Sequence, residues 1–240
     1  MRIITVDNYE QMSALAADII GEIVRSNPFA TLGLATGSTI LGTYAQLIDK
    51  YRSGELSFRN VKTVNLDEYL GLSRDNAQSY ARYMACNLFD CIDVDIRNTF
   101  IPCGVAQDVA RECEEYDKLL DIIPRDLQLL GLGSNGHIAF NEPGTPFDTR
   151  TRVVQLERST IVDNSRFFAG IDETPQQAIT MGIADIVSAE KLLLLASGLS
   201  KAQAVKAMLQ GEVSINCPAS ILRTHPDAIV ILDKLAASLL

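Results

Sequence analysis

Five short runs of apolar residues predict the main strands of this protein. They occupy residues 31–35, 61–66, 127–132, 192–196 and 228–232, and most of them lack an alternation of apolar and polar side chains. Strands have this pattern when both faces of their sheet are covered, as in the centre of a parallel sheet. The runs therefore predict a mostly parallel, buried sheet.

Helical patterns lie between these runs. Apolar residues recur at three- and four-residue steps from Tyr9 to Val24, with Asp7 as the expected N-cap and Asn27-Pro28 as the end. Four more helices are expected, at 39–51, 79–89, 105–120 and 200–209. This alternation predicts an α/β fold with a doubly wound, Rossmann-like sheet and helices on both of its faces.

We expect one domain, residues 1–240, because no linker rich in Pro, Gly or Ser and no internal repeat divides the chain. Residues 143–174 are the least regular part and form a candidate excursion or lid. The longest apolar runs are strand-sized, and polar residues interrupt the N-terminus. We therefore expect neither a signal peptide nor a membrane span.

The composition narrows the function. The chain has 21 basic and 30 acidic residues, and its formal charge of -9 repels nucleic acid backbones and anionic lipid surfaces. Hydrophobic residues make up 47% and charged residues 21%, as in globular rather than disordered proteins. We expect a folded, cytoplasmic protein without nucleic acid or membrane partners.

Cysteine and histidine usage disfavours a metal centre. The cysteines include no C-x2-C pair, and we expect buried or inert free thiols in a reducing compartment. They are Cys86, Cys91, Cys103, Cys113 and Cys217. Only two histidines occur in the chain, so a metal would have to bind carboxylates.

Polar segments follow four of the predicted strands, at the position where ligands bind in an open parallel sheet. These segments are Thr36-Gly37-Ser38-Thr39, Asp67-Glu68-Tyr69, residues 133–137 and residues 197–201. Because the carboxyl ends of parallel strands share one edge of the sheet, we expect the four segments to lie together.

The segment from Thr36 to Thr39 precedes a predicted helix and offers backbone N–H groups and hydroxyls, which suit a phosphate or a carboxylate. The alternative is a tight turn capped by Ser38 or Thr39. Lys201 favours the anion, since a lysine in the first turn of a helix opposes the helix dipole unless an anion is bound nearby. We therefore predict an anion site here.

A G-x-G-x-x-G pattern at residues 131–136 follows a strand, as in dinucleotide-binding proteins. That fingerprint must open a helix, whereas Pro143 and Gly144 end regular structure soon after the pattern. The context therefore disfavours a nicotinamide cofactor.

Asp67 and His137 are the candidate acid–base groups. A carboxylate at the end of a buried strand tends toward a raised pKa and general-base work, whereas Glu68 beside it is better explained as a helix cap or a solvated side chain. His137 has Glu142 five residues later to orient it, and His225 is expected on a surface turn. The residues themselves indicate metal-free acid–base chemistry on a small anionic metabolite.

These motifs together closely resemble the glucosamine-6-phosphate deaminase family, whose members are also called isomerases. The matching stretches are L-A-T-G-S-T at 34–39, L-D-E-Y-L-G-L at 66–72, G-H-I-A-F-N-E-P at 136–143, N-S-R-F-F at 164–168 and G-L-S-K-A at 198–202. They follow the family's order, and the second and third stretches are the most specific.

The resemblance implies conversion of α-D-glucosamine 6-phosphate and water to D-fructose 6-phosphate and ammonia in amino-sugar catabolism, without a metal or an organic cofactor. By position, Asp67 would move a proton between C2 and C1. His137 would open the sugar ring, oriented by Glu142 and Asn135. The implied phosphate site consists of Thr36, Gly37, Ser38, Thr39, Arg166 and Lys201.

Two departures from the family pattern matter. Many members have aspartate where this chain has Asn135, and an amide cannot stabilise an imidazolium by charge. Val154 and Gln155 stand where the hexameric, allosteric members have a Lys-Thr pair for the activator N-acetylglucosamine 6-phosphate, and those members have a longer C-terminal segment. We therefore expect a non-allosteric monomer.

Two other functions fit part of the same pattern. A 6-phosphogluconolactonase has a similar fold and a similar G-H loop, but does not need the L-D-E-Y block or the F-N-E-P continuation. A non-catalytic sugar-phosphate sensor would use the phosphate site and leave Asp67 and His137 idle. Ammonia release separates the three functions.

Overall fold

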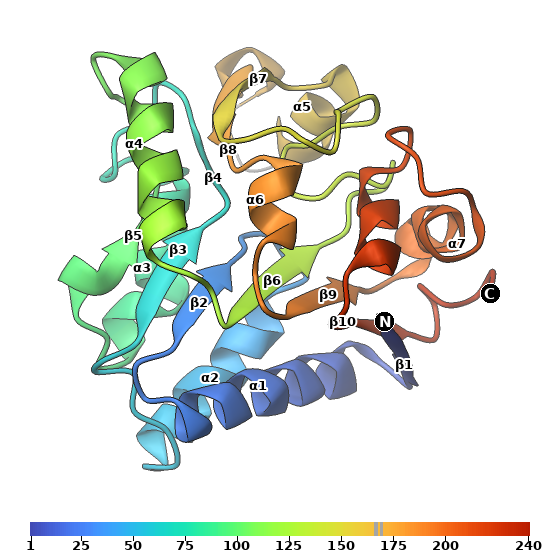
Figure 1. Ribbon diagram of the computed structural model, residues 1–240, viewed down its shortest axis with the longest axis horizontal. Helices are drawn as coiled ribbons and strands as arrows, with labels where there is room; N and C mark the ends of the chain where they lie inside the picture. Colours follow the sequence, from blue (N-terminus) through green and yellow to red (C-terminus); the bar gives the residue numbers. More distant parts are fainter. Residues whose placement is uncertain (166–167, 169) are drawn as a thin grey trace.

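A seven-stranded sheet forms the centre of the computed structural model, which describes residues 1–165, 168 and 170–240 (Figure 1). The strand order is β1-β10-β9-β6-β2-β3-β5, and all neighbouring strands run parallel. The strands are β1 (Arg2–Val6), β2 (Thr31–Leu34), β3 (Lys62–Asn65), β5 (Thr99–Phe100), β6 (Leu127–Gly131), β9 (Leu192–Ala196) and β10 (Ala228–Asp233). The predicted mostly parallel sheet is confirmed, with all five apolar runs in it.

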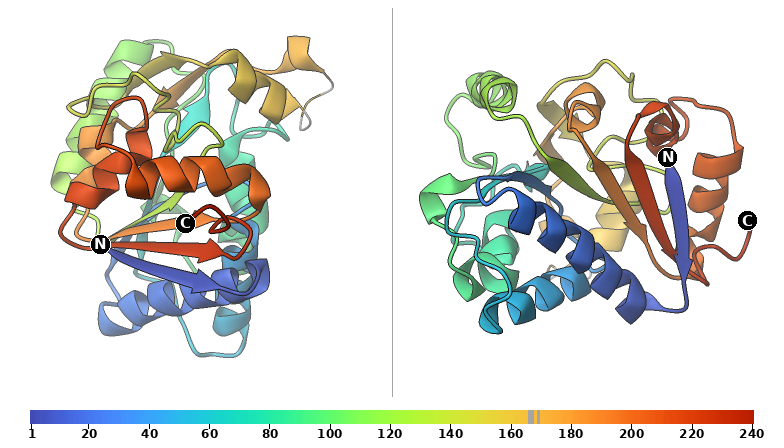
Figure 2. Two further views of the ribbon diagram at one scale, coloured as in Figure 1. Left: turned by 90° about the vertical axis from the view of Figure 1, so that its right-hand side faces the viewer. Right: turned by 60° about the horizontal axis from the view of Figure 1, so that its bottom comes forward.

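Helices cover both faces of this sheet, as predicted: α1 and α2 lie on one face, and α4 and α6 on the other (Figures 1 and 2). The helices are α1 (Tyr9–Ser26), α2 (Leu41–Arg52), α3 (Tyr80–Asn87), α4 (Val109–Ile122), α5 (Arg158–Ser165), α6 (Ile183–Val187) and α7 (Ala202–Gln210). Short 3-10 turns are η1 (Phe89–Cys91), η2 (Ile96–Asn98), η3 (Ile171–Glu173), η4 (Leu199–Lys201) and η5 (Pro218–Thr224). No described helix has the length and apolar character needed to span a membrane.

The first helix is capped one residue later than predicted. The side-chain oxygen of Asn8 accepts the backbone N–H of Gln11 at 2.9 Å, so Asn8 and not Asp7 is the N-cap of α1. The Asp7 carboxylate instead contacts the side chains of Gln11 and Lys234. Two adjacent residues of equal capping propensity cannot be distinguished by spacing alone.

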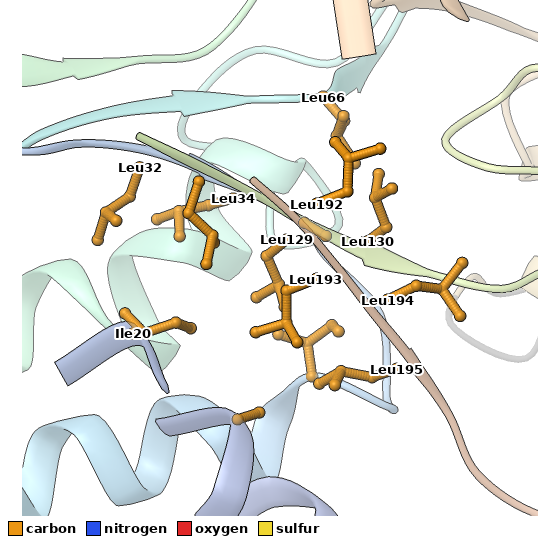
Figure 3. Close-up of a cluster of buried hydrophobic side chains, with 14 of the residues drawn as sticks. Ile20, Leu32, Leu34, Leu66, Leu129, Leu130, Leu192, Leu193, Leu194 and Leu195 are labelled. Atoms are coloured by element: carbon orange, nitrogen blue, oxygen red, sulfur yellow. The ribbon is translucent and has the colours of Figure 1, made fainter. Parts of the chain in front are cut away.

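The core explains why the apolar runs lack alternation. Strand β9 lies between β6 and β10, and its four leucines are fully buried. Successive side chains of a strand point to opposite faces of the sheet, and Leu193 and Leu195 lie on the side of Ile20 from α1 (Figure 3). Leu192 and Leu194 pack on the opposite face, so each position of β9 must be apolar.

A second, antiparallel sheet was not predicted. Its order is β4-β8-β7, with β4 at Asp67–Tyr69, β8 at Gln177–Thr180 and β7 at Arg152–Gln155. Asp67 is therefore paired with Thr180 in a strand and does not lie in a loop after β3. Strands of three and four residues with polar or charged members carry too weak a periodic signal to be predicted.

The expectation about His225 is wrong. His225 is 8% exposed, not on a surface turn: its Nε2 lies 2.9 Å from the carbonyl oxygen of Ala189, and its Nδ1 accepts the backbone N–H of Asp227. Both ring nitrogens are thus engaged in structural bonds. The cysteines agree with the expectation of free thiols: all five are free, Cys113 and Cys217 are buried, and Cys86 is exposed.

Candidate active site

A cavity of about 390 Å³ opens at the carboxyl ends of β2 and β6. Its wall includes residues from each of the four polar segments that follow the predicted strands. The predicted site residues among them are Thr36, Gly37, Ser38, Thr39, Asp67, His137 and Lys201. Arg166 lies outside the described residues. The expectation that these segments share one edge of the sheet is therefore confirmed for the described residues.

Asp67 is 6% exposed, and its place on β4 brings it into the cavity wall. Burial disfavours the charged carboxylate and, with the negative charge of the adjacent Glu68, raises the pKa of Asp67 to about 8. A carboxyl group with such a pKa is a much stronger base than an exposed aspartate. This matches the property that general-base catalysis near neutral pH requires.

Glu68 follows Asp67 but has a different role, because successive residues of a strand point to opposite sides. Its carboxylate is 1% exposed and accepts the backbone N–H groups of Tyr80 and Ala81, at the start of α3, each at 2.9 Å. It also accepts the N–H of Tyr69. Glu68 is therefore not solvated, and the N-cap residue of α3 is Ser79. Glu68 binds two backbone N–H groups in the first turn of that helix from the side, and so connects β4 to α3.

His137 and Glu142 form a hydrogen-bonded pair. The imidazole Nδ1 lies 3.1 Å from Glu142 Oε2, which also accepts the side-chain N–H of Asn135 at 2.7 Å. Asn135 therefore orients the carboxylate and does not bond the ring of His137, whose backbone N–H it accepts. With Nδ1–H donated to Glu142, Nε2 is the ring nitrogen that can exchange a proton with a ligand in the cavity.

Glu142 stays ionised across the physiological pH range. Burial alone would raise its pKa, but contacts with His137 and hydrogen bonds from Thr160 and Asn135 outweigh burial and lower the pKa to about 2. The carboxylate can thus stabilise a positive charge on the imidazole. Thr160, on α5, is a site residue that was not predicted, because it does not directly follow an apolar run and belongs to none of the motifs in the sequence.

The loop between β6 and Glu142 fits closely around the imidazole. A Cβ atom at Gly133 would lie 2.4 Å from three atoms of the His137 ring, so a larger residue there would displace the ring. Ala139 has φ of 51°, a left-handed conformation that non-glycine residues rarely adopt. No helix opens at this G-x-G-x-x-G pattern: among the described residues the next helix is α5, which begins at Arg158. The pattern therefore lacks the helix that a dinucleotide site requires.

The predicted anion site consists of two loops at helix starts. Residues 36–39 connect β2 to α2, and Gly37 has φ of 106°. Lys201 ends η4 directly before α7. The loop that carries Lys201 is held by Asp233 at the end of β10, whose carboxylate accepts the hydroxyl of Ser197 and the backbone N–H of Gly198.

Asp233→Asn is expected to lower the free energy of unfolding at pH 7 by about 1–2 kcal/mol, or the melting temperature by roughly 2–6 °C. Hydrogen bonds from Ser197 and backbone amides outweigh the effect of burial and lower the pKa of Asp233. Such a carboxylate stabilises the fold above its unfolded-state pKa and loses that contribution as the pH falls. Thermal denaturation from pH 7 to pH 3 should therefore show wild type and variant converging.

Asp49→Asn is the matched control, because Asp49 is exposed on α2. Its melting temperature should follow that of the wild type at each pH. An Asp233→Asn protein as stable as wild type at pH 7 would contradict the role given to this carboxylate.

An aromatic wall closes one side of the cavity and was not predicted. The rings of Tyr69 and Tyr80 lie 4.7 Å apart between centroids, and their hydroxyls are 3.1 Å apart. Phe140 and Phe168 pack against Tyr69 at 5.7 and 5.8 Å. These rings come from four separate segments, so only the tertiary structure brings them together around the site.

Known proteins share this sequence over its whole length. A glucosamine-6-phosphate deaminase of Clostridium perfringens (strain SM101 / Type A) is 50% identical over 241 residues, and one of Bacillus pumilus is 51% identical over 240 residues. Each comparison covers 100% of both chains. A solved structure of a monomeric glucosamine-6-phosphate deaminase is 48% identical, with a TM-score of 0.98 and 100% of both chains covered.

A more distant likeness extends to the fold alone. A 6-phosphogluconolactonase from Trypanosoma brucei is 22% identical, with a TM-score of 0.82, and the superposition covers 100% of this chain and 98% of that one. Residues 7–231 match the family model of glucosamine-6-phosphate isomerases and 6-phosphogluconolactonase. The chain therefore belongs to the family of glucosamine-6-phosphate isomerases and 6-phosphogluconolactonases.

Proposed function

We propose that this protein is a glucosamine-6-phosphate deaminase, which converts α-D-glucosamine 6-phosphate and water to D-fructose 6-phosphate and ammonia in amino-sugar catabolism. The observation that carries the proposal is one cavity lined by Asp67, His137, residues 36–39 and Lys201. The names of the relatives that are about half identical over their full length support it. The proposed enzyme is a cytoplasmic hydrolase that uses no metal or organic cofactor.

Substrate binding begins with the phosphate in this proposal. The N–H groups and hydroxyls of residues 36–39, the ammonium of Lys201 and the guanidinium of Arg166 hold it. A phosphate fixed at this end places the sugar carbons toward Asp67 and His137. The aromatic wall of Tyr69, Tyr80 and Phe140 shields them from water.

Ring opening is assigned to His137. Nε2 accepts the proton of the anomeric hydroxyl and delivers a proton to the ring oxygen, while the bond from C1 to the ring oxygen breaks and the C1 carbonyl forms. The imidazole carries a positive charge between these two transfers. The ionised Glu142, hydrogen-bonded to Nδ1, stabilises that charge. Glu142 and Asn135 thus act through His137.

Isomerisation and deamination follow on the open chain. The C2–H is acidic only there, because it is then adjacent to a carbonyl. Asp67 removes this proton while O1 takes one from the C2 ammonium group of the substrate, which gives a neutral enolamine. Asp67 then returns its proton to C1, which leaves a hydroxyl on C1 and an iminium at C2. Water adds to C2, and ammonia departs to leave the ketone of fructose 6-phosphate. The raised pKa of Asp67, about 8, makes it a strong base for the first transfer.

The proposed enzyme is one catalytic domain of residues 1–240, with residues 143–174 as a lid over the site. One large cluster of buried side chains, from Met12 to Ala236, supports the single domain. The lid is supported by two contacts of this segment with the site: the Thr160 hydroxyl bonds Glu142, and Phe168 lines the cavity.

The proposed enzyme is also monomeric and not allosteric. The relative with the TM-score of 0.98 is described as monomeric, which supports the first part. Val154 and Gln155 of β7 stand where allosteric members have a Lys-Thr pair, which supports the second.

The function is tested with the purified protein, glucosamine 6-phosphate and EDTA. We expect equimolar ammonia and fructose 6-phosphate, and a hyperbolic saturation curve that N-acetylglucosamine 6-phosphate leaves unchanged. Hydrolysis of 6-phosphogluconolactone without ammonia release would favour the lactonase instead. Phosphate binding without turnover of either compound would favour a sugar-phosphate sensor.

A further inference from the structure

The loop of residues 36–39, called the anion loop below, has backbone N–H groups that donate no hydrogen bond to any described residue. Among residues 1–165, 168 and 170–240, the backbone N–H groups of Gly37, Ser38 and Thr39 make no hydrogen bond, whereas the next amide, of Ile40, donates to the carbonyl of Gly37. All three residues line the cavity at the start of α2. Such unpaired amides at a helix start suit a phosphate.

The carbonyl groups of the same loop are held by two tyrosines from different helices. The hydroxyl of Tyr83, on α3, donates to the carbonyl oxygen of Gly37 at 2.8 Å. The hydroxyl of Tyr9, on α1, donates to the carbonyl oxygen of Ser38 at 3.1 Å and accepts the N–H of Gly42 at 2.7 Å. Tyr9 thereby joins the loop to the first turn of α2.

These bonds fix the direction of the amides. A trans peptide group is planar, so its C=O and N–H point in opposite directions. With the Gly37 carbonyl turned to Tyr83, the N–H of Ser38 points away from Tyr83. In the same way, the bond from Tyr9 to the Ser38 carbonyl directs the N–H of Thr39 away from Tyr9. Neither peptide group can rotate without breaking a tyrosine hydrogen bond.

Close packing of α1 on α2 makes the contact of Tyr9 possible. A Cβ atom at Gly42 would lie 2.3 Å from the hydroxyl oxygen of Ser13 and 2.9 Å from Cε1 of the Tyr9 ring. Only glycine allows this approach of the two helices. Gly42 therefore allows both the close packing of α1 on α2 and the observed position of the Tyr9 ring.

We propose that Tyr9 and Tyr83 are positioning residues, which preset the amides of Ser38 and Thr39 to bind the phosphate of the substrate. The inference rests on the proposed function for the identity of the substrate, but its phosphate-binding part does not depend on turnover. Presetting lowers the cost of ordering the loop when the phosphate binds. The two hydroxyls thus act through the loop and not on the reacting atoms.

The test uses Tyr9→Phe, Tyr83→Phe and the double variant, with Tyr51→Phe as the matched control. Tyr51 is half-buried on α2 against the core, so its change also removes one hydroxyl from a packed tyrosine. The dissociation constant of inorganic phosphate is measured by calorimetric titration. KM and kcat are measured with glucosamine 6-phosphate, and folding is checked by the melting temperature.

Each single variant is expected to raise the phosphate dissociation constant and KM by about 3–10-fold, as loss of one hydrogen bond does, with kcat changed less than about twofold. The double variant should exceed either single variant, and Tyr51→Phe should match wild type. Folded single and double variants with unchanged phosphate affinity would overturn the proposal, as would a fall in kcat with unchanged KM. If wild type releases no ammonia but its phosphate affinity depends on both tyrosines, the proposed function fails and this inference stands.

Discussion

Asp67→Asn is expected to lower kcat for ammonia release by about 10³-fold or more, because the variant has no base to carry the proton from C2 to C1. The amide has nearly the shape of the carboxylate, so the cavity should still bind the substrate. KM should therefore change much less than kcat. Coupled assays of ammonia and fructose 6-phosphate measure both constants, and Asp49→Asn, a change of an exposed carboxylate on α2, is the matched control.

The same variant is expected to be more stable than wild type at pH 8. The pKa of Asp67, about 8 in the folded protein, is above the usual unfolded value of about 4, so between these values only the unfolded chain releases the proton. Wild type therefore loses stability as the pH rises through this window, and the asparagine variant does not. The gain should be roughly 2–5 kcal/mol at pH 8 and small near pH 4.

Together the two measurements separate catalysis from folding. A variant that is more stable but inactive would show that Asp67 takes part in the reaction and does not stabilise the fold. Activity of Asp67→Asn close to that of wild type would remove Asp67 from the mechanism. A melting-temperature difference that does not grow between pH 4 and pH 8 would contradict the raised pKa.

His137→Gln is expected to lower kcat with glucosamine 6-phosphate by about 10²–10⁴-fold, because the glutamine cannot shuttle a proton between the anomeric hydroxyl and the ring oxygen. The defect should disappear with a substrate analogue that lacks the 4- and 5-hydroxyl groups and so cannot close a furanose or pyranose ring. Wild type and variant should release ammonia from this open-chain analogue at similar rates, since Asp67 alone then performs the proton transfer.

The comparison of the two substrates is the control for folding and binding. An equal loss of activity on the cyclic substrate and on the open-chain analogue would contradict a role confined to ring opening. It would place His137 in the later proton transfers instead. Glu142→Gln should show the same dependence on the substrate with a smaller loss, because the imidazole remains and only its charged partner is removed.

The central sheet was predictable because strands that are buried on both faces have uninterrupted apolar runs in the sequence. The leucines of β9 are apolar at every position since each has the core on its side of the sheet. Strand β1 has no such mark: it lies at an edge, with Arg2 and Ile3 exposed. Strand β5 consists of two residues only. Exposure at the edge explains why β1 was not predicted, and shortness explains why β5 was not.

The candidate site was predictable where residues directly follow apolar runs, as the loop at 36–39 and His137 do. Its supporting contacts were not. The pairing of Asp67 with Thr180, and the hydrogen bond from Thr160 to Glu142, join residues far apart in the chain. Local periodicity contains no information about such pairs.

The sequence by itself determined the parallel sheet, the edge at which the polar segments gather and the residue types available for acid–base chemistry. These follow from burial patterns and strand ends, which are local properties of the chain. Only the tertiary structure decided that Asp67 is buried enough to become a strong base, that Glu142 rather than Asn135 bonds the imidazole, and that Tyr9 and Tyr83 hold the anion loop. Desolvation and hydrogen bonding depend on which distant segments pack together, so they exist only once the chain has folded.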